Sequence, residues 1–303
     1  MIPRHPGLLG FLAGAGIFLS AAAPAMGPKP VPEADQEIRL FSSEAHPDGT
    51  GWKVLIRGRL YEPELDSGKR KLLVKGVAEA LKFTEEEEKS PLLMERGLLL
   101  LSDGKTDKAV RIRVAGRDIV ASPTDSGGVF TVEARVAPEE TSGNLVKFST
   151  LPSTANPASW HGSAQLIQST GLSVISDLDD TVKVTNVTDR KEMMRNTLVR
   201  PFQAAPGMAD LYRAWKQAKG EQIAFHLVSA SPCQLQAPLE EFLGGAGFPR
   251  FSFHCRSVNI SIATLSEISS DPVLFKVPTI SEILGRWPQR KFVLVGDSGE
   301  KDP

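Results

Sequence analysis

The sequence predicts an α/β protein in two parts, a β-rich, sandwich-like half over residues 36–165 and a half built on a parallel sheet over residues 166–303. Two observations lead to this prediction. Apolar and polar residues alternate along segments of the first half, as they do in half-buried antiparallel strands. From Leu172 onward, short apolar segments alternate with amphipathic ones, which indicates parallel strands joined by helices.

The composition is that of a globular protein with room for two domains. The chain has 303 residues, of which 41% are hydrophobic and 23% charged. Its formal net charge of -1 argues against a broad nucleic-acid footprint, so no nucleic-acid partner is expected. The oligomeric state does not follow from these numbers.

The N-terminal residues have the pattern of a secretory signal. Arg4 and His5 precede an uncharged apolar stretch that ends in Ala23-Pro24-Ala25, a small-residue cleavage pattern. We therefore expect residues 1–25 to be a signal peptide, residues 26–35 to be a proline-rich linker, and the protein to be periplasmic or secreted. An uncleaved membrane anchor is the alternative, and membrane association stays open.

The first half contains strand patterns interrupted by one helical stretch. Strands are expected over residues 52–61, 110–114 and 129–136, with a hairpin turn at Thr124-Asp125-Ser126-Gly127-Gly128. Residues 71–96 have a helical pattern, and the acidic run Glu85–Glu88 is expected to be a solvated helix face. Because this half has no evident nucleophile or metal cluster, we expect it to be accessory.

The second half alternates strands with helices. Strands are expected over residues 172–176, 223–228, 250–254 and 291–295, and helices over residues 206–216, 234–243 and 279–287, with Gly220 ending the first helix and Thr279 capping the last.

Polar side chains follow three of these strands. Asp177 and Asp179 come after the first, Ser229 after the second, and Asp297 and Asp302 after the last. The carboxyl ends of parallel strands meet at one edge of a sheet, where ligands bind. One carboxylate there can attack phosphorus while another moves protons, and a hard cation such as Mg²⁺ would relieve the repulsion between carboxylates and phosphate. The alternative is an acidic loop that caps the next helix.

These segments resemble the haloacid-dehalogenase (HAD) phosphatase superfamily. More narrowly, Asp177-Leu178-Asp179-Asp180-Thr181, Val228-Ser229-Ala230-Ser231-Pro232 and Gly296-Asp297 with Asp302 are similar to the actin-patch-associated, lipin-related type of Mg²⁺-dependent phosphatidate phosphatase. The resemblance implies a HAD-like Rossmannoid sheet in the second half. It also implies a further helix and strand beyond Asp302, so that the domain is expected to be truncated at its C-terminus.

The resemblance further implies roles for individual residues. Asp177 would be the nucleophile that forms an aspartyl phosphate, Asp179 the acid and base, Ser229 a phosphate ligand, and Lys276 a positive charge on the transition state. Mg²⁺ would be held by Asp177, the backbone carbonyl of Asp179, Asp297 and Asp302. The expected activity is phosphoric monoester hydrolysis, with phosphatidate converted to diacylglycerol.

Two other functions stay open at this point. One is a non-catalytic phospholipid-binding module, and the other is a periplasmic phosphatase acting on a soluble phosphomonoester. The segments that could cover the site are short, and an open site suits a phosphate on a large or membrane-bound substrate.

A few further residues have local interpretations. His226 alternates with apolar strand residues and is expected to be a core histidine, whereas His254 and Arg256 follow the third strand and could contact a head group. Whether Cys233 and Cys255 form a disulfide does not follow from the sequence.

Overall fold

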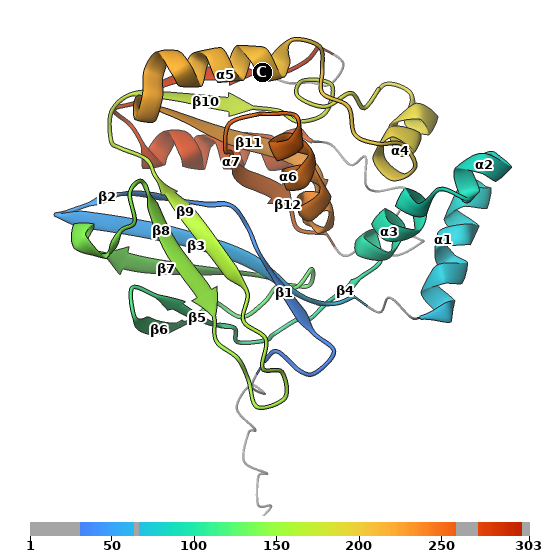
Figure 1. The fold of residues 1–303 in the computed structure, drawn as a ribbon, viewed down its shortest axis with the longest axis horizontal. Helices are drawn as coiled ribbons and strands as arrows, with labels where there is room; N and C mark the ends of the chain where they lie inside the picture. The colour runs from blue at the N-terminus through green and yellow to red at the C-terminus, as the bar shows by residue number, and fades with distance from the viewer. Residues whose placement is uncertain (1–30, 64–66, 259–271, 299–303) are drawn as a thin grey trace, which may run out of the picture.

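The computed structural model describes residues 31–63, 67–258 and 272–298. The predictions for residues 1–25, for most of the linker and for Asp302 lie outside these ranges. The chain forms two sheets, one mostly antiparallel and one parallel, which confirms a mixed α/β protein (Figure 1). The first sheet ends at β9 and the second begins at β10, so the division falls where the sequence pattern changes.

Nine strands of the first half form one hydrogen-bonded sheet rather than two separate sheets. Its longest strand, β3, pairs with four others, and side chains from distant strands, such as Ile56, Ile112, Val132 and Phe148, meet in one buried cluster. The sheet therefore folds over on itself around one core. The strands are β1 (Glu37–Leu40), β2 (Ser43–Asp48), β3 (Gly51–Glu62), β4 (Asp103–Gly104), β5 (Arg111–Val114), β6 (Arg117–Val120), β7 (Val129–Val136), β8 (Leu145–Thr150) and β9 (His161–Leu166).

The predicted hairpin at Thr124–Gly128 is not where adjacent strands pair. The hairpin lies earlier, between β5 and β6, where Ala115 and Gly116 have positive φ angles of 48° and 70°. In the predicted segment, the Asp125 carboxylate accepts hydrogen bonds from the amides of Gly127 and Val129 and forms a turn that leads into β7. β7 pairs with β3 and not with the strand that precedes it in the chain.

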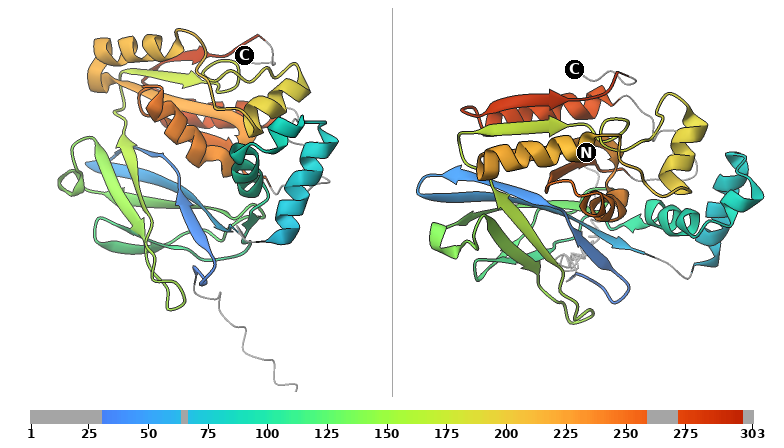
Figure 2. Two further views of the ribbon diagram at one scale, coloured as in Figure 1. Left: turned by 45° about the vertical axis from the view of Figure 1, so that its right-hand side comes forward. Right: turned by 45° about the horizontal axis from the view of Figure 1, so that its top comes forward.

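The helical stretch consists of α1 (Gly68–Ala80), α2 (Glu85–Glu88) and α3 (Pro91–Leu100). Thr84 and Glu87 form a reciprocal capping box at the start of α2. Buried residues of this insert, such as Val74 and Leu93, belong to the same apolar cluster as Val174 and Phe225 of the parallel sheet. The helices of the first half therefore pack directly against the second half, beside α4 (Arg190–Leu198) (Figures 1 and 2).

The second sheet has four strands that are all parallel, in the order β12-β11-β10-β13. Alternate residues of its strands face opposite sides. Val174 and Leu227 pack with α5 and α6, whereas Ile175 and Val228 pack with α7. The elements are β10 (Leu172–Ser176), α5 (Met208–Lys219), β11 (Ile223–Pro232), α6 (Gln236–Gly245), β12 (Ser252–Arg256), α7 (Val273–Arg286) and β13 (Lys291–Val295).

The last helix begins earlier than predicted. α7 starts at Val273, so Lys276 lies within it and not ahead of it, and Thr279 is not its cap. Thr279 instead donates a side-chain hydrogen bond to the carbonyl of Phe275 inside the helix. The prediction was wrong because it treated Thr279 as a cap, whereas Pro278 lies inside α7 and removes one helical hydrogen bond without ending the helix.

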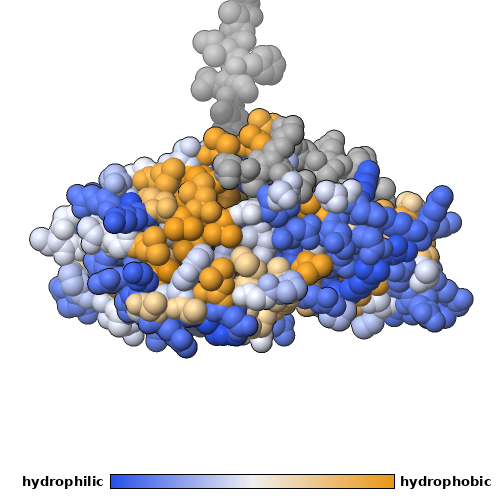
Figure 3. Space-filling model, turned by 90° about the horizontal axis from the view of Figure 1, so that it is seen from above, coloured by the Kyte–Doolittle hydropathy of each residue, from blue (hydrophilic) through white to orange (hydrophobic). Residues whose placement is uncertain are grey.

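The edge strand β13 and the helix α7 expose apolar residues. Val293 and Leu294 of β13 are 38% and 44% exposed, and Leu274 and Val277 of α7 are 78% and 50% exposed. Figure 3 shows hydrophobic residues gathered on the face above this half of the molecule. Among the residues that the structure describes, none of the helices has the length and apolarity needed to cross a membrane.

Both cysteines are free and buried. Burial raises the pKa of the Cys233 thiol to about 11, and it raises the pKa of Cys255 as well. We predict that neither thiol of the folded protein reacts with a water-soluble disulfide reagent at pH 8, and that both react fully in denaturant without reductant. If the denatured, unreduced protein showed no reactive thiols, Cys233 and Cys255 would not be free cysteines.

Candidate functional site

The parallel register brings the ends of β10 and β13 level with the middle of β11. Ser176 at the end of β10 is level with Leu227 of β11 and with Val295 of β13. The backbone amide of Asp177 donates a hydrogen bond of 2.9 Å to the carbonyl of Val295, so the pairing continues to the first aspartate. Asp297 follows two residues after Val295. The predicted meeting of strand ends at one edge is therefore present for β10 and β13.

Asp177 is paired with Lys276. The Nζ atom of Lys276 lies 2.9 Å from Oδ1 of Asp177, and each side chain is only 5% exposed. The two residues also line one pocket, together with Val228, Ile280 and Gly296. The structure thus brings the lysine from the first turns of α7 onto the carboxylate that the sequence analysis expects to be the nucleophile.

Asp179 lies in a separate network. Its Oδ1 atom is 2.9 Å from Nζ of the buried Lys183 and accepts a hydrogen bond of 2.7 Å from the Thr185 hydroxyl, and its Oδ2 atom accepts one of 2.8 Å from Ser231. Burial by itself would raise the pKa of Asp179, but the Lys183 charge and these hydrogen bonds lower it below the ordinary value. Asp179 is therefore ionised in this arrangement.

The loop after Asp179 is held by Asp180. This residue has a positive φ of 57°, a conformation that aspartate tolerates better than most residues. Its carboxylate accepts hydrogen bonds of 2.7 Å from each of the backbone amides of Thr185, Asn186 and Val187. The chain is thereby folded back, which places Thr185 and Lys183 against Asp179.

Ser229 is fully buried inside β11, which runs on to Pro232, so Ser229 does not follow the strand as predicted. Its hydroxyl accepts a hydrogen bond from the amide of Ser231 and lies 3.4 Å from Oδ2 of Asp179. Of the two serines, Ser231 lies closer to the Asp179 carboxylate than Ser229 does, and the sequence analysis did not single out Ser231. Lys183 and Thr185 were also missed, although Lys183 lies four residues after Asp179, a spacing at which a tight loop can bring the two side chains together.

The two histidines that the sequence analysis considered do not join these residues, and both contact Glu44 of the β-rich half. Asp302 lies outside the described residues. His226 is a buried residue of the sheet, as expected, and is hydrogen-bonded to Glu44 and Ser173. His254 is buried as well and its Nε2 atom lies 3.4 Å from Glu44, so the structure turns it toward the β-rich half and not toward a head group.

The residues at the edge suit an oxygen-coordinated cation. Asp177 and Asp297 offer carboxylates at the ends of neighbouring strands. The side chain of Asp179 is occupied by Lys183, Thr185 and Ser231, which leaves its backbone carbonyl as the oxygen it can offer. Hard carboxylate and carbonyl oxygens are what Mg²⁺ prefers, so the donor set fits the expected cofactor.

A parallel α/β domain with aspartate, lysine and serine side chains at its carboxyl edge has the arrangement of a phosphohydrolase domain. Residues 172–303 match the family model of the catalytic domain of phosphatidate phosphatase APP1. This part of the chain therefore belongs to the APP1 phosphatidate phosphatase family, a family of phosphoric monoester hydrolases, and the resemblance seen in the sequence is confirmed.

Two curated proteins are similar to this chain. Phosphatidate phosphatase APP1 of Saccharomyces cerevisiae is 31% identical over 182 residues, which cover 59% of this chain and 30% of the yeast protein. An uncharacterized protein of Schizosaccharomyces pombe is 31% identical over 231 residues, which cover 71% of this chain and 36% of that protein. The chain thus spans about a third of each relative. The second alignment is longer than residues 172–303, so the similarity extends into the β-rich half.

We predict that Lys183→Met destabilises the protein by about 3 kcal/mol at pH 7, because it leaves the Asp179 carboxylate without its buried cation. A carboxyl whose pKa is lowered by folding stabilises the folded state above its unfolded pKa of about 3.9, and this stabilisation disappears as the pH falls through the folded pKa. The difference between the variant and the wild type should therefore shrink below about pH 4. Urea unfolding at pH 7 and pH 3 measures both values.

Lys191→Met on the exposed side of α4 is the matched control and should change stability by less than about 0.5 kcal/mol. A Lys183→Met loss that is as large at pH 3 as at pH 7 would show that the lysine contributes by packing and not by its charge.

Proposed function

We propose that the protein is a Mg²⁺-dependent phosphatase that hydrolyses a phosphomonoester through an aspartyl phosphate, with phosphatidate as the substrate and diacylglycerol as a product. The observation that carries this proposal is the pairing of Asp177 with Lys276 at 2.9 Å, beside a second aspartate held in a different network. Two carboxylates one residue apart with different partners can perform different tasks. The family of residues 172–303 supports the substrate class.

In the first step an Asp177 oxygen attacks phosphorus, the bond from phosphorus to the lipid oxygen breaks, and the leaving alkoxide takes a proton from Asp179. In the second step water attacks the aspartyl phosphate, the bond between Asp177 and phosphorus breaks, and Asp179 takes the proton of the water. Lys276 stabilises the charge on the phosphoryl oxygens, and Ser229 donates to one of them.

The contacts of Asp179 favour its role as a base. A lowered pKa keeps its carboxylate ionised at neutral pH, ready to accept a proton from water. Donation to the alkoxide in the first step requires that Asp179 first be protonated, which the neighbouring Lys183 opposes. We propose that Asp179 acts both as the acid of the first step and as the base of the second. We expect its acid role to depend on how phosphate binding changes the contact with Lys183.

Asp177, Asp297 and the backbone carbonyl of Asp179 would hold Mg²⁺, and Asp302 is proposed as a further ligand. When bound, the ion offsets the negative charge that accumulates between carboxylate and phosphate.

The finer fold and the location belong to the same proposal. We propose that the parallel half is a HAD-like Rossmannoid domain, which the strand order β12-β11-β10-β13 supports, and that the β-rich half is sandwich-like. The pattern of residues 1–25 supports a signal peptide and a periplasmic or secreted protein.

The test is Mg²⁺-dependent phosphate release from phosphatidate in mixed micelles, compared with a soluble aryl phosphate. We expect release from phosphatidate, loss on chelation, and a reduction of at least about 10³-fold in Asp177→Asn, which keeps the shape of the side chain but removes its nucleophilic charge. Release only from the aryl phosphate would favour a phosphatase of soluble esters. Phosphatidate binding without turnover in the wild type would favour a non-catalytic lipid-binding module.

The first turns of α1 support contact with an anionic lipid surface. Leu72 and Leu73 are 69% and 37% exposed, while Lys69 and Lys75 beside them are exposed as well. Exposed leucines between lysines suit a surface with negative head groups and an apolar interior. Figures 1 and 2 show α1 on the side of the molecule toward which β10 points, the side that carries the site. The acidic residues of α2 follow beyond the other end of α1, so the contact is confined to its beginning.

We predict that the protein binds vesicles that contain phosphatidate more tightly than vesicles of phosphatidylcholine alone, and that binding weakens as salt is added. Leu72→Asp should weaken binding about 10-fold or more, since it replaces a leucine that inserts into the lipid by a negative charge that the anionic head groups repel. Val120→Asp is the matched control, because Val120 is 62% exposed on β6 of the other half. Sedimentation with vesicles measures both variants, and equal losses would exclude α1 as the contact.

A further inference from the structure

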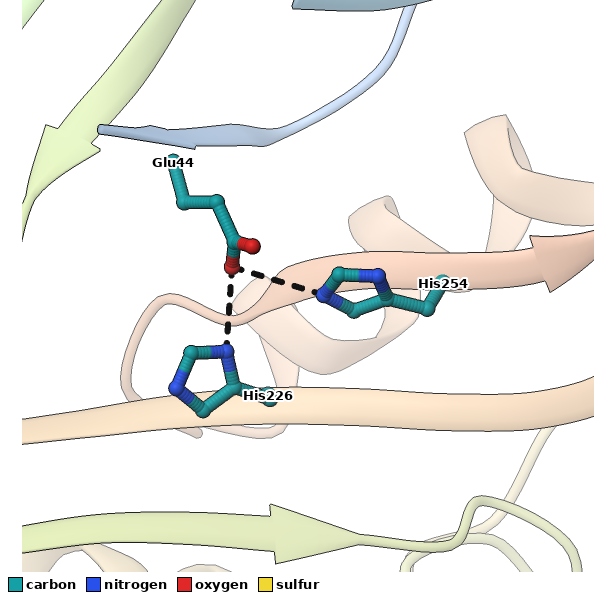
Figure 4. A group of neighbouring side chains, drawn as sticks. All are labelled: Glu44, His226 and His254. Atoms are coloured by element: carbon teal, nitrogen blue, oxygen red, sulfur yellow. Dashed lines mark hydrogen bonds and ion pairs between the residues drawn. The ribbon is translucent and has the colours of Figure 1, made fainter. Parts of the chain in front are cut away.

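A buried carboxylate joins the two halves of the molecule. Glu44 of β2 is 2% exposed, and its Oε2 atom lies 3.0 Å from Nδ1 of His226 on β11 and 3.4 Å from Nε2 of His254 on β12 (Figure 4). Its Oε1 atom accepts a hydrogen bond from the guanidinium of Arg286 on α7. One residue of the β-rich half thus contacts three elements of the parallel half.

The hydrogen bonds around His226 have a defined direction. Nε of Arg290 can only donate, and it donates to the Ser173 hydroxyl at 2.8 Å. The Glu44 carboxylate can only accept, so Nδ1 of His226 carries the proton that is donated to Glu44, and Nε2 of the neutral ring then accepts from the Ser173 hydroxyl, 3.2 Å away. This chain connects Glu44 to β10, four residues before Asp177.

Glutamate and two histidines are also the ligand types of a zinc site, and the three groups lie close together. Two contacts speak against that function. The Arg286 guanidinium occupies the other oxygen of Glu44, which places a fixed positive charge beside any cation. The nitrogen of His226 that faces Glu44 carries a proton in the hydrogen-bond chain, so it cannot be a ligand without breaking the chain. The cluster is an ion network.

Helix α7 connects this network to the site. Arg286 and Lys276 lie ten residues apart on α7, about 15 Å along the helix axis. The C-terminal end of α7 is held by the ion pair between Arg286 and Glu44. It is also held by the indole of Trp287, which donates a hydrogen bond of 3.1 Å to the carbonyl of Ile167. Ile283 packs the same helix against β11. A helix is stiff along its axis, so a slide or rotation at Arg286 would move Lys276.

We propose that Glu44 is a positioning residue that holds α7, and through it Lys276, in register with Asp177. The β-rich half would then be part of the catalytic unit, because it supplies the fixed charge on which α7 is seated. The kinetic part of this inference rests on the proposed phosphatase function, whereas the placement of Lys276 can be measured without it.

The experiment compares Glu44→Gln with Glu282→Gln. Glu282 is the exposed second partner of Arg286, at 67% side-chain exposure, so the control removes the same charge from the same arginine without disturbing the interface. The first readout is the rate at which an amine-acylating reagent modifies Lys276, followed by mass spectrometry. In the folded wild type Lys276 is protected by burial and by Asp177. We expect Glu44→Gln to raise its rate about 10-fold and leave exposed Lys75 and Lys291 unchanged.

The second readout is the split between kcat and KM. We expect Glu44→Gln to lower kcat about 10-fold with KM changed by less than about threefold, because Lys276 is misplaced but the rest of the substrate site is intact. Unchanged modification of Lys276, or equal increases at all lysines, would overturn the proposal, even if the melting temperature falls. If Glu44→Gln does not fold, Arg286→Lys keeps the charge but loses the guanidinium geometry, and the same criteria apply. Absence of turnover in the wild type would reject the phosphatase function and leave the acylation result to decide the role of Glu44.

Discussion

The site depends on the parallel register of β10 with β11 and β13. Because all three strands run in one direction and Ser176 is level with Leu227 and Val295, the residues that follow β10 and β13 emerge together, beside the later residues of β11. The hydrogen bond from the Asp177 amide to Val295 extends this pairing to the proposed nucleophile itself. Backbone pairing thus sets the position of Asp177, and side-chain contacts set its electrostatic surroundings.

The two aspartates of the first loop differ because their cations come from different parts of the chain. Lys183 reaches Asp179 within one tight loop, whereas Lys276 reaches Asp177 from a helix nearly one hundred positions later. The local pair forms whenever the Asp180 turn forms. The distant pair requires that α7 be seated correctly on the sheet, and α7 contacts the β-rich half through Arg286 and Glu44.

A buried carboxylate is costly unless it is paired and hydrogen-bonded, and the surroundings of Glu44 satisfy both conditions. Burial would raise the pKa of Glu44, but the charge of His254 and the hydrogen bonds of both histidines hold it well below the ordinary value.

Much of the secondary structure followed from residue patterns. The strands around Val54, Val132, Val174 and Leu294 were predicted because alternation or apolar runs specify burial locally. The sandwich prediction is not confirmed, since alternation shows that a strand has one buried face but not which sheet it joins. The β5–β6 hairpin was missed because Ala115-Gly116 is a weaker turn signal than the Gly127-Gly128 pair, and the predicted start of α7 was too late because Thr279 has the side chain of a helix cap.

For the site, the sequence by itself determined which side chains follow the strands and, through their order, the family of residues 172–303. Asp177 and Asp297 could be found this way because a parallel sheet converts positions after strands into positions at one edge, whereas Ser229 lies inside β11. Only the tertiary structure decided which side chains contact one another. Lys276 pairs with Asp177, Lys183 and Ser231 contact Asp179, and Glu44 contacts both histidines. Those contacts depend on how a loop closes and how a helix and a second sheet pack, and such distances between residues far apart in the chain are set by the whole core and not by any local pattern.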